Sequence, residues 1–209
     1  MPDLTHETKF VGPVIGIDEA GRGPWAGPVT VTAIWLGADT ATLPAGIDDS
    51  KKLKPLRRDA LADRLMTPPY IHHTETVPVE MIDRFGILRA TFFGMVCAAK
   101  AVAELMVAAG QPRPVHALVD GNLLPQDMPL PATALVKGDS LSLSIAAASI
   151  IAKTTRDRYM QKLHATYPAY CWDRNMGYGT KAHRAGLESH GVTPHHRRSF
   201  KPVQALLCR

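Results

Sequence analysis

Short runs of apolar and β-branched residues, each bounded by glycine or proline, predict strands along the chain. The predicted strands cover 11–17, 29–36, 70–77, 115–119 and 132–136. The link between the first two is short and rich in glycine and proline, which favours antiparallel pairing between them.

Apolar residues spaced three and four apart predict helices between these strands. The predicted helices cover 55–66, 83–109, 139–164 and 181–190, and 168–179 is expected to be loop. Asp83 is the expected N-cap of the second helix, and Asp139 or Ser140 that of the third.

This order of elements predicts an α/β fold with a mixed sheet. A strand after a long helix tends to lie parallel to an earlier strand. If 11–17 and 115–119 are neighbours in this way, Asp18 and Asp120 meet at their carboxyl ends, where open sheets bind ligands.

Asp18 and Asp120 each follow an apolar strand and precede a turn that contains glycine. Crowded carboxylates repel one another, and Mg²⁺ or Mn²⁺ relieves this repulsion with oxygen ligands. Glu19 and Asp139 would make a cluster of four. On residues alone two interpretations stay open: a metal cluster, or acids that only cap loops and helices.

Glu19 adds a geometric condition. In a continuing strand Asp18 and Glu19 point to opposite faces of the sheet. They share a site only if the strand ends or bulges there, and the AGRGP segment at 20–24 is suited to this. We therefore expect the strand to end before the acids.

Charge is distributed unevenly. Residues 151–209 hold 11 Lys and Arg against 3 Asp and Glu, whereas residues 1–150 hold 13 against 16. This basic end indicates either a polyanionic partner or a solvated basic face. Four of its histidines are expected at the surface: His183, His190, His195 and His196. The adjacent pair at 195–196 lacks metal-ligand spacing.

Composition and motifs exclude other classes. The longest uncharged stretch, 23–38, is too short and too broken for a membrane span. Cys97, Cys171 and Cys208 form no CxxC pair, which argues against a disulfide framework or structural zinc. The first ten residues lack the apolar core of a secretory signal, so we expect a cytoplasmic protein. P-loop, dinucleotide-binding and nucleophile-elbow motifs are absent.

Five segments, in order along the chain, resemble ribonuclease HII, the bacterial type 2 ribonuclease H. They are IGIDEAGRGPWAGPV (15–29), DDSKKL (48–53), LVDGN (118–122), KGDSLSLSIAAASIIAKTTRD (137–157) and MGYGTKAH (176–183). The resemblance implies a ribonuclease H-like five-stranded mixed sheet flanked by helices, with a small C-terminal helical extension. It implies a catalytic domain at 1–165 and a basic extension at 166–209 packed on it.

The resemblance also implies an activity. The enzyme would hydrolyse the RNA strand of RNA–DNA hybrids and incise 5′ of single ribonucleotides embedded in duplex DNA. It would leave 3′-hydroxyl and 5′-phosphate ends and use two Mg²⁺ or Mn²⁺ ions, the second binding with substrate. We expect a monomer with nucleic acid as its partner and no membrane association.

Site residues follow from the matching motifs. The implied catalytic acids are Asp18, Glu19, Asp120 and Asp139, of which the first three bind metal. The implied substrate contacts are Gly21, Arg22, Gly23, Ser50, Lys51 and Tyr178. The glycine-arginine segment would contact the 2′-hydroxyl and phosphates, and Tyr178 would stack on the next sugar. Two alternatives stay open: Tyr178 as a packed turn residue, and Ser50 and Lys51 as an N-cap region.

Two other identities stay open. A type 3 ribonuclease H would carry an extra N-terminal domain, whereas few residues precede the first predicted strand here. A catalytically silent hybrid-binding module is disfavoured because all four acids are present. Met176 and Cys171 depart from the usual family pattern and bear on affinity rather than on the reaction.

Overall fold

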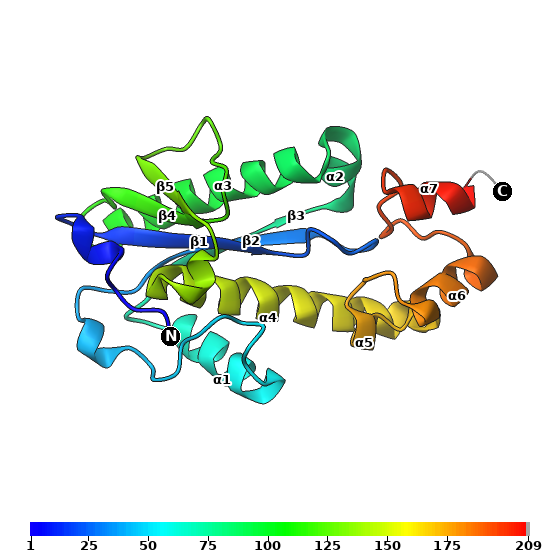
Figure 1. Cartoon of the computed structure of the whole chain (residues 1–209), viewed down its shortest axis with the longest axis horizontal. Helices are drawn as coiled ribbons and strands as arrows, with labels where there is room; N and C mark the ends of the chain where they lie inside the picture. The colour runs from blue at the N-terminus through cyan, green and yellow to red at the C-terminus, as the bar shows by residue number, and fades with distance from the viewer. Residues whose placement is uncertain (208–209) are drawn as a thin grey trace.

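A single mixed sheet forms the centre of the computed structural model, which describes residues 1–207. Its strand order is β3-β2-β1-β4-β5 (Figure 1). The strands are β1 (Val14–Ala20), β2 (Val29–Trp35), β3 (Ile71–Val77), β4 (His116–Asp120) and β5 (Ala132–Leu135). The pairs β1–β2 and β2–β3 are antiparallel, and β1–β4 and β4–β5 are parallel. The predicted five-stranded mixed sheet is therefore confirmed.

Helices cover both faces of this sheet. They are α1 (Pro55–Leu65), α2 (Val79–Phe85), α3 (Ile87–Ala108), α4 (Leu143–Thr166), α5 (Trp172–Asn175), α6 (Lys181–His190) and α7 (Lys201–Leu207). Figure 1 shows α2 and α3 above the sheet and α1 and α4 below it. One apolar core lies between α3 and the sheet, and a second lies between the sheet, α4 and α1.

Helix α3 is long and apolar enough to cross a membrane, judged by length and composition alone. Its buried residues, which include Met95, Val102 and Met106, pack against β1, β2 and β4 in the core. This packing explains its apolar composition, because a helix that covers a sheet must bury a wide stripe.

Two expected helix starts are wrong. The predicted 83–109 helix is two helices, because Gly86 adopts a positive φ of 82° that ends α2 and begins α3. Asp83 lies inside α2 and accepts hydrogen bonds from the backbone of Arg198 and Ser199. The third helix begins after Ser142, whose hydroxyl accepts from the N–H of Ile145 at 3.3 Å, so Asp139 is not its cap.

The segment after α4 folds back onto the loop between β1 and β2. The N–H of Trp25 donates to the carbonyl of Gly177, and the N–H of Gly27 donates to that of His195, both at 2.8 Å. Within the expected 168–179 loop lies the short helix α5. Cys97 and Cys171 are free thiols, and Cys208 lies outside the described residues.

Helix α4 approaches β1 most closely at Gly16. A Cβ atom at Gly16 would collide with the backbone of Ser144 and Ile145 at the start of α4. This contact fixes how the helix, and the turn before it, sit over the strand that carries Asp18.

We expect Gly16→Ala to lower the free energy of unfolding by about 3 kcal/mol, since overpacking against rigid backbone costs about 1–3 kcal/mol or more. Urea unfolding followed by circular dichroism measures this. Ala185→Gly on the exposed face of α6 is the control and should cost only about 1 kcal/mol. An equal or smaller loss for Gly16→Ala would contradict the close contact.

Candidate active site

The parallel pairing of β1 with β4 ends at the carboxyl edge of the sheet. Ile17 of β1 is paired with Val119 of β4, so Asp18 and Asp120 are the next residues on the two strands. Both acids line the same cleft. Their expected convergence is therefore confirmed, and it follows from the parallel crossover through α3.

The expectation that the first strand ends before the acids is wrong. Strand β1 continues to Ala20, and Glu19 is paired with Val31 of β2. The neighbouring strand β4 ends instead, and its pairing with β1 stops at Ile17. Beyond that residue one edge of β1 has no adjacent strand. Side chains from both faces of β1 can therefore reach one cleft, which Asp18 and Glu19 both line.

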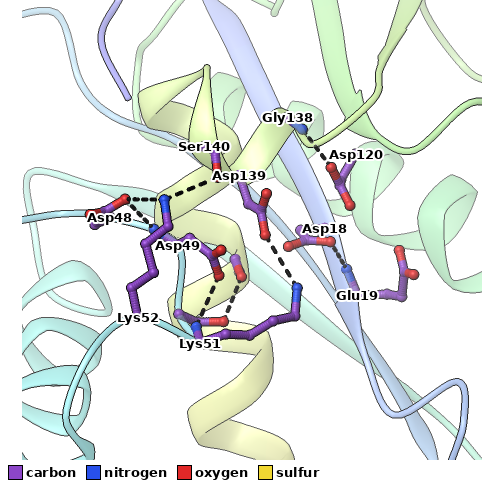
Figure 2. A network of polar contacts seen from close by, with 12 residues as sticks. Asp18, Glu19, Asp48, Asp49, Lys51, Lys52, Asp120, Gly138, Asp139 and Ser140 are labelled. Carbon is purple, nitrogen blue, oxygen red and sulfur yellow. Dashed lines mark hydrogen bonds and ion pairs between the residues drawn. The ribbon is translucent and has the colours of Figure 1, made fainter. Parts of the chain in front are cut away.

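Asp139 comes to this edge on a short 3-10 turn, Gly138–Ser140, between β5 and α4. The N–H of Gly138 donates to Asp120 Oδ1 at 2.7 Å and ties the turn to the end of β4. Asp139 is 5% exposed. Figure 2 shows the carboxylates of Asp18, Asp120 and Asp139 grouped together, with Asp139 directed toward the ammonium group of Lys51.

Burial and like charge act together on these acids. Burial raises the pKa of Asp18 well above its ordinary value, and the carboxylates of Glu19 and Asp120 raise it further. Burial also raises the pKa values of Glu19 and Asp120. These carboxyl groups are thus held close enough to disfavour each other's ionised form.

The DDSKKL segment supplies a positive charge beside the acids. Lys51 Nζ lies 3.3 Å from Asp139 Oδ2. Burial alone would lower the pKa of Lys51, but the carboxylates of Asp139 and Asp18 outweigh burial and raise it. Ser50 is buried, with its Oγ 2.8 Å from Ser149 Oγ of α4. Neither residue caps α1, whose N-cap position is Lys54.

The acids open into a cleft of about 340 Å³. The predicted site residues that line it are Asp18, Glu19, Gly21, Arg22, Gly23, Ser50, Lys51, Asp120 and Tyr178. Asp139 adjoins this group through its contact with Lys51. All the predicted site residues are therefore brought together from separate parts of the chain.

Two buried arginines hold the Gly21–Gly23 segment from behind. Arg197 donates to the carbonyl oxygens of the first two residues of this segment, at 2.6 and 2.9 Å. Arg197 and Arg156 also both donate to the carbonyl of Pro28 at 3.0 Å. Within residues 1–207, the N–H groups of Gly21–Gly23 meet no acceptor. The segment is thus anchored by the carbonyls of Gly21 and Arg22, and all three of its residues line the cleft.

Arg197 and two histidines correct the expectation of a surface-exposed basic end. His183, His196 and Arg197 are at most 1% exposed. Burial lowers the pKa of Arg197 to about 9 and that of Arg156 to about 10. Sequence reasoning missed these arginines because isolated charges are rarely buried, and no local pattern distinguishes them from their solvated neighbours.

Lys153 of α4 also lines the cleft. Its Nζ lies 2.7 Å from Asp157 Oδ1, and Arg58 Nη2 lies 3.2 Å from Asp157 Oδ2. The charge of Lys153 is therefore partly compensated by Asp157, its ion-pair partner on α4.

The family model for ribonuclease HII matches residues 15–203. This chain belongs to the ribonuclease HII family. The ribonuclease HII of Jannaschia sp. is 47% identical over 99% of this chain and 98% of its own. The ribonuclease HII in the PCNA complex from Archaeoglobus fulgidus has a TM-score of 0.69 and 27% identity, and the match covers 90% of this chain and 95% of the other.

A type 3 enzyme shares the fold but not the family. Bst-RNase HIII, solved in complex with Mn²⁺, has a TM-score of 0.71 at 20% identity. The match covers 94% of this chain but 69% of the Bst chain. The ribonuclease H-like fold is therefore confirmed, and the family model together with the near full-length relatives identifies the chain as a member of the ribonuclease HII family rather than the type 3 alternative.

Membership in the ribonuclease HII family makes this chain a metal-dependent endonuclease of the ribonuclease H type that cleaves the RNA strand of RNA–DNA hybrids. The alternative of a catalytically silent binding module is thereby excluded.

The chemistry of the site fits the divalent cation that ribonuclease HII requires. The available donors are carboxylate oxygens, which Mg²⁺ and Mn²⁺ prefer. Burial, and to a lesser degree repulsion between the carboxylates, raises the pKa values of Asp18 and Asp120, and a cation would offset both effects. Within residues 1–207, no three acidic, histidine or cysteine side chains converge closely enough to hold a metal ion. Binding of a cation by these acids would therefore require their carboxylates to turn toward one another.

The raised pKa of Asp18 predicts how stability depends on pH in the metal-free enzyme. A folded-state pKa above the unfolded value of about 3.9 stabilises the fold at low pH, and this contribution is lost as pH rises through the raised pKa. We expect the free energy of unfolding, measured by urea titration with a chelator, to fall over this range. Asp18→Asn should flatten the fall, and equal pH dependence in both proteins would contradict the assignment.

Proposed function

We propose that this enzyme, besides cleaving the RNA strand of hybrids, incises 5′ of single ribonucleotides embedded in duplex DNA by a two-metal mechanism. The products would carry 3′-hydroxyl and 5′-phosphate ends. One observation carries the proposal. The acids at the ends of β1 and β4 share a cleft with a segment of free backbone amides and with an aromatic ring, Tyr178.

Asp18, Glu19 and Asp120 would hold the cations, and Asp139 would complete the acidic group. Two bound ions, Mg²⁺ or Mn²⁺, would supply an activated water and stabilise the leaving 3′-oxygen. The sheet fixes Asp18 and Asp120, while Gly138 orients Asp120 through its N–H. Lys51, with 76% of its side chain exposed, is free to leave Asp139 and contact a phosphate.

The Gly21–Gly23 segment would recognise the ribonucleotide. Its backbone N–H groups can donate to a phosphate oxygen or to the 2′-hydroxyl, the group that distinguishes RNA from DNA. Arg22 adds a guanidinium whose side chain is half exposed and which lies 3.5 Å from Glu19. Because Arg197 fixes the carbonyls of Gly21 and Arg22, the segment is held in place before substrate binds.

Tyr178 would stack on the sugar that follows the ribonucleotide and favour a deoxyribose there. Its side chain is half exposed and faces the Gly21–Gly23 segment, since a Cβ at Gly23 would contact the Tyr178 ring. This position next to the proposed ribose contacts supports recognition of an RNA–DNA junction.

The basic end of the chain would bind the duplex backbone. Its exposed cations include Lys181, Arg184, Arg198 and Lys201. We propose that 166–209 forms this extension and 1–165 the catalytic domain. This division is supported by the end of α4 at Thr166.

We expect Asp18→Asn to lower the incision rate by roughly 10³-fold with either Mg²⁺ or Mn²⁺, because several kcal/mol of charge stabilisation depend on the bound ions. A gel assay on duplex DNA with one ribonucleotide measures this, and a filter-binding assay in Ca²⁺ should show nearly unchanged affinity. Asp63→Asn, which changes an exposed acid on α1, is the control. Wild-type incision by Asp18→Asn would contradict the assigned acids.

We expect Tyr178→Ala to lower kcat/KM for a single embedded ribonucleotide by roughly tenfold or more, since aromatic stacking is worth about 1–3 kcal/mol. Cleavage of a continuous RNA–DNA hybrid should fall much less. Tyr159→Ala, a tyrosine of similar exposure on α4, is the matched control. Equal losses on the two substrates would count against junction recognition.

A further inference from the structure

A buried polar cluster lies beneath Tyr178. It consists of Trp172 of α5, His183 of α6 and His196, each at most 1% exposed. None of the three lines the cleft. Their aromatic rings pack together with Tyr170, whose centroid lies 5.0 Å from that of Trp172 and 4.9 Å from that of His196.

The hydrogen bonds of this cluster determine where each histidine carries its proton. The backbone N–H of Thr193 donates to His196 Nδ1 at 3.0 Å. A backbone amide can only donate, so Nδ1 of His196 carries no proton and Nε2 does. His196 Nε2 lies 3.0 Å from His183 Nε2 and donates to it.

The same logic applies to the second histidine. The indole N–H of Trp172, which is also only a donor, points to His183 Nε2 at 3.2 Å. His183 Nε2 is therefore the acceptor for two donors, and its proton is on Nδ1. His183 Nδ1 lies 3.0 Å from the carbonyl oxygen of Tyr178 and donates to it.

Burial keeps this arrangement in one protonation state. It lowers the pKa of His183, and burial together with the nearby His183 lowers the pKa of His196 to about 3. Both rings are thus neutral near pH 7. A neutral imidazole has one N–H, so a ring whose first nitrogen accepts a hydrogen bond donates from its second nitrogen.

The hydrogen bonds from His196 to His183 and from His183 onward end at the carbonyl of Tyr178, whose backbone N–H and C=O are both hydrogen-bonded within the chain. The N–H of Tyr178 donates to the carbonyl of Asn175, and the Tyr178 carbonyl also accepts from the N–H of Thr180, both at 2.8 Å. The following residue, Gly179, lies against the indole of Trp25, where any Cβ would collide with the ring. The backbone is fixed while the half-exposed phenol faces the cleft.

We propose that His183 is a positioning residue for Tyr178, and that His196 and Trp172 hold it in the tautomer that donates to the Tyr178 carbonyl. The inference rests on the proposed function, in which the Tyr178 ring recognises the RNA–DNA junction. It adds that this recognition depends on a buried relay that never touches the substrate.

Paired substitutions test whether the function of His183 depends on an N–H donor at the position of its Nδ1 atom. Asparagine places an N–H near the position of Nδ1, whereas glutamine places its polar end near Nε2. We expect His183→Gln to lower kcat/KM for a single embedded ribonucleotide about tenfold, with little change on a continuous RNA–DNA hybrid. His183→Asn should recover most of this loss. His190→Gln, an exposed histidine on the same helix, should have no effect.

A double-mutant cycle separates this inference from the proposed function. In a Tyr178→Ala background, His183→Gln should cause no further loss on the single-ribonucleotide substrate, because residues that act through one another are not additive. Additive losses, equal losses on both substrates, or no recovery by asparagine would overturn the positioning role.

Tyr178→Ala alone tests the proposed function. Thermal unfolding of each variant identifies any that has lost its fold. If His183→Gln does not fold, the test is made with His183→Asn: its ratio of kcat/KM on the single-ribonucleotide substrate to that on the continuous hybrid should be close to the wild-type ratio.

Discussion

The parallel pairing of β1 with β4 is the constraint on which the site depends. It ends at Ile17 and Val119, so each strand delivers an acid immediately beyond the last pair. Two of the four acids are nearly fully buried, Asp18 at 4% and Asp139 at 5% exposed. Folding therefore brings together charges that repel, and a hard divalent cation is the ligand that makes this arrangement favourable.

Positive charge lies on the other side of the cleft, where it is carried by buried arginines. Arg156 and Arg197 are buried, yet their guanidinium groups bind backbone carbonyls rather than carboxylates. Carbonyl oxygens satisfy the donors without cancelling the charge. The Gly21–Gly23 segment thereby gains fixed carbonyls and a positive surrounding, both of which suit the anionic substrate proposed to bind there.

Fixed backbone beneath an exposed recognition group occurs twice in this cleft. The arginines hold the Gly21–Gly23 segment, and the histidine relay holds Tyr178. In both cases the supporting groups are deeply buried, and the contact groups are accessible. In the proposed substrate complex this arrangement would reduce the ordering cost at binding, because the donors and the ring would not need to be organised by the substrate.

The strands, their mixed pairing and the convergence of Asp18 and Asp120 could be predicted from the sequence, because apolar runs and a helical crossover leave few topologies. The helix break at Gly86 and the true cap at Ser142 could not, since local propensity does not decide between adjacent candidates. Residue types also predicted oxygen ligands for a hard cation. Only the tertiary structure decided that Glu19 stays on a continuous strand and that His183 and Arg197 lie inside, because burial of a polar group depends on partners far away in the chain.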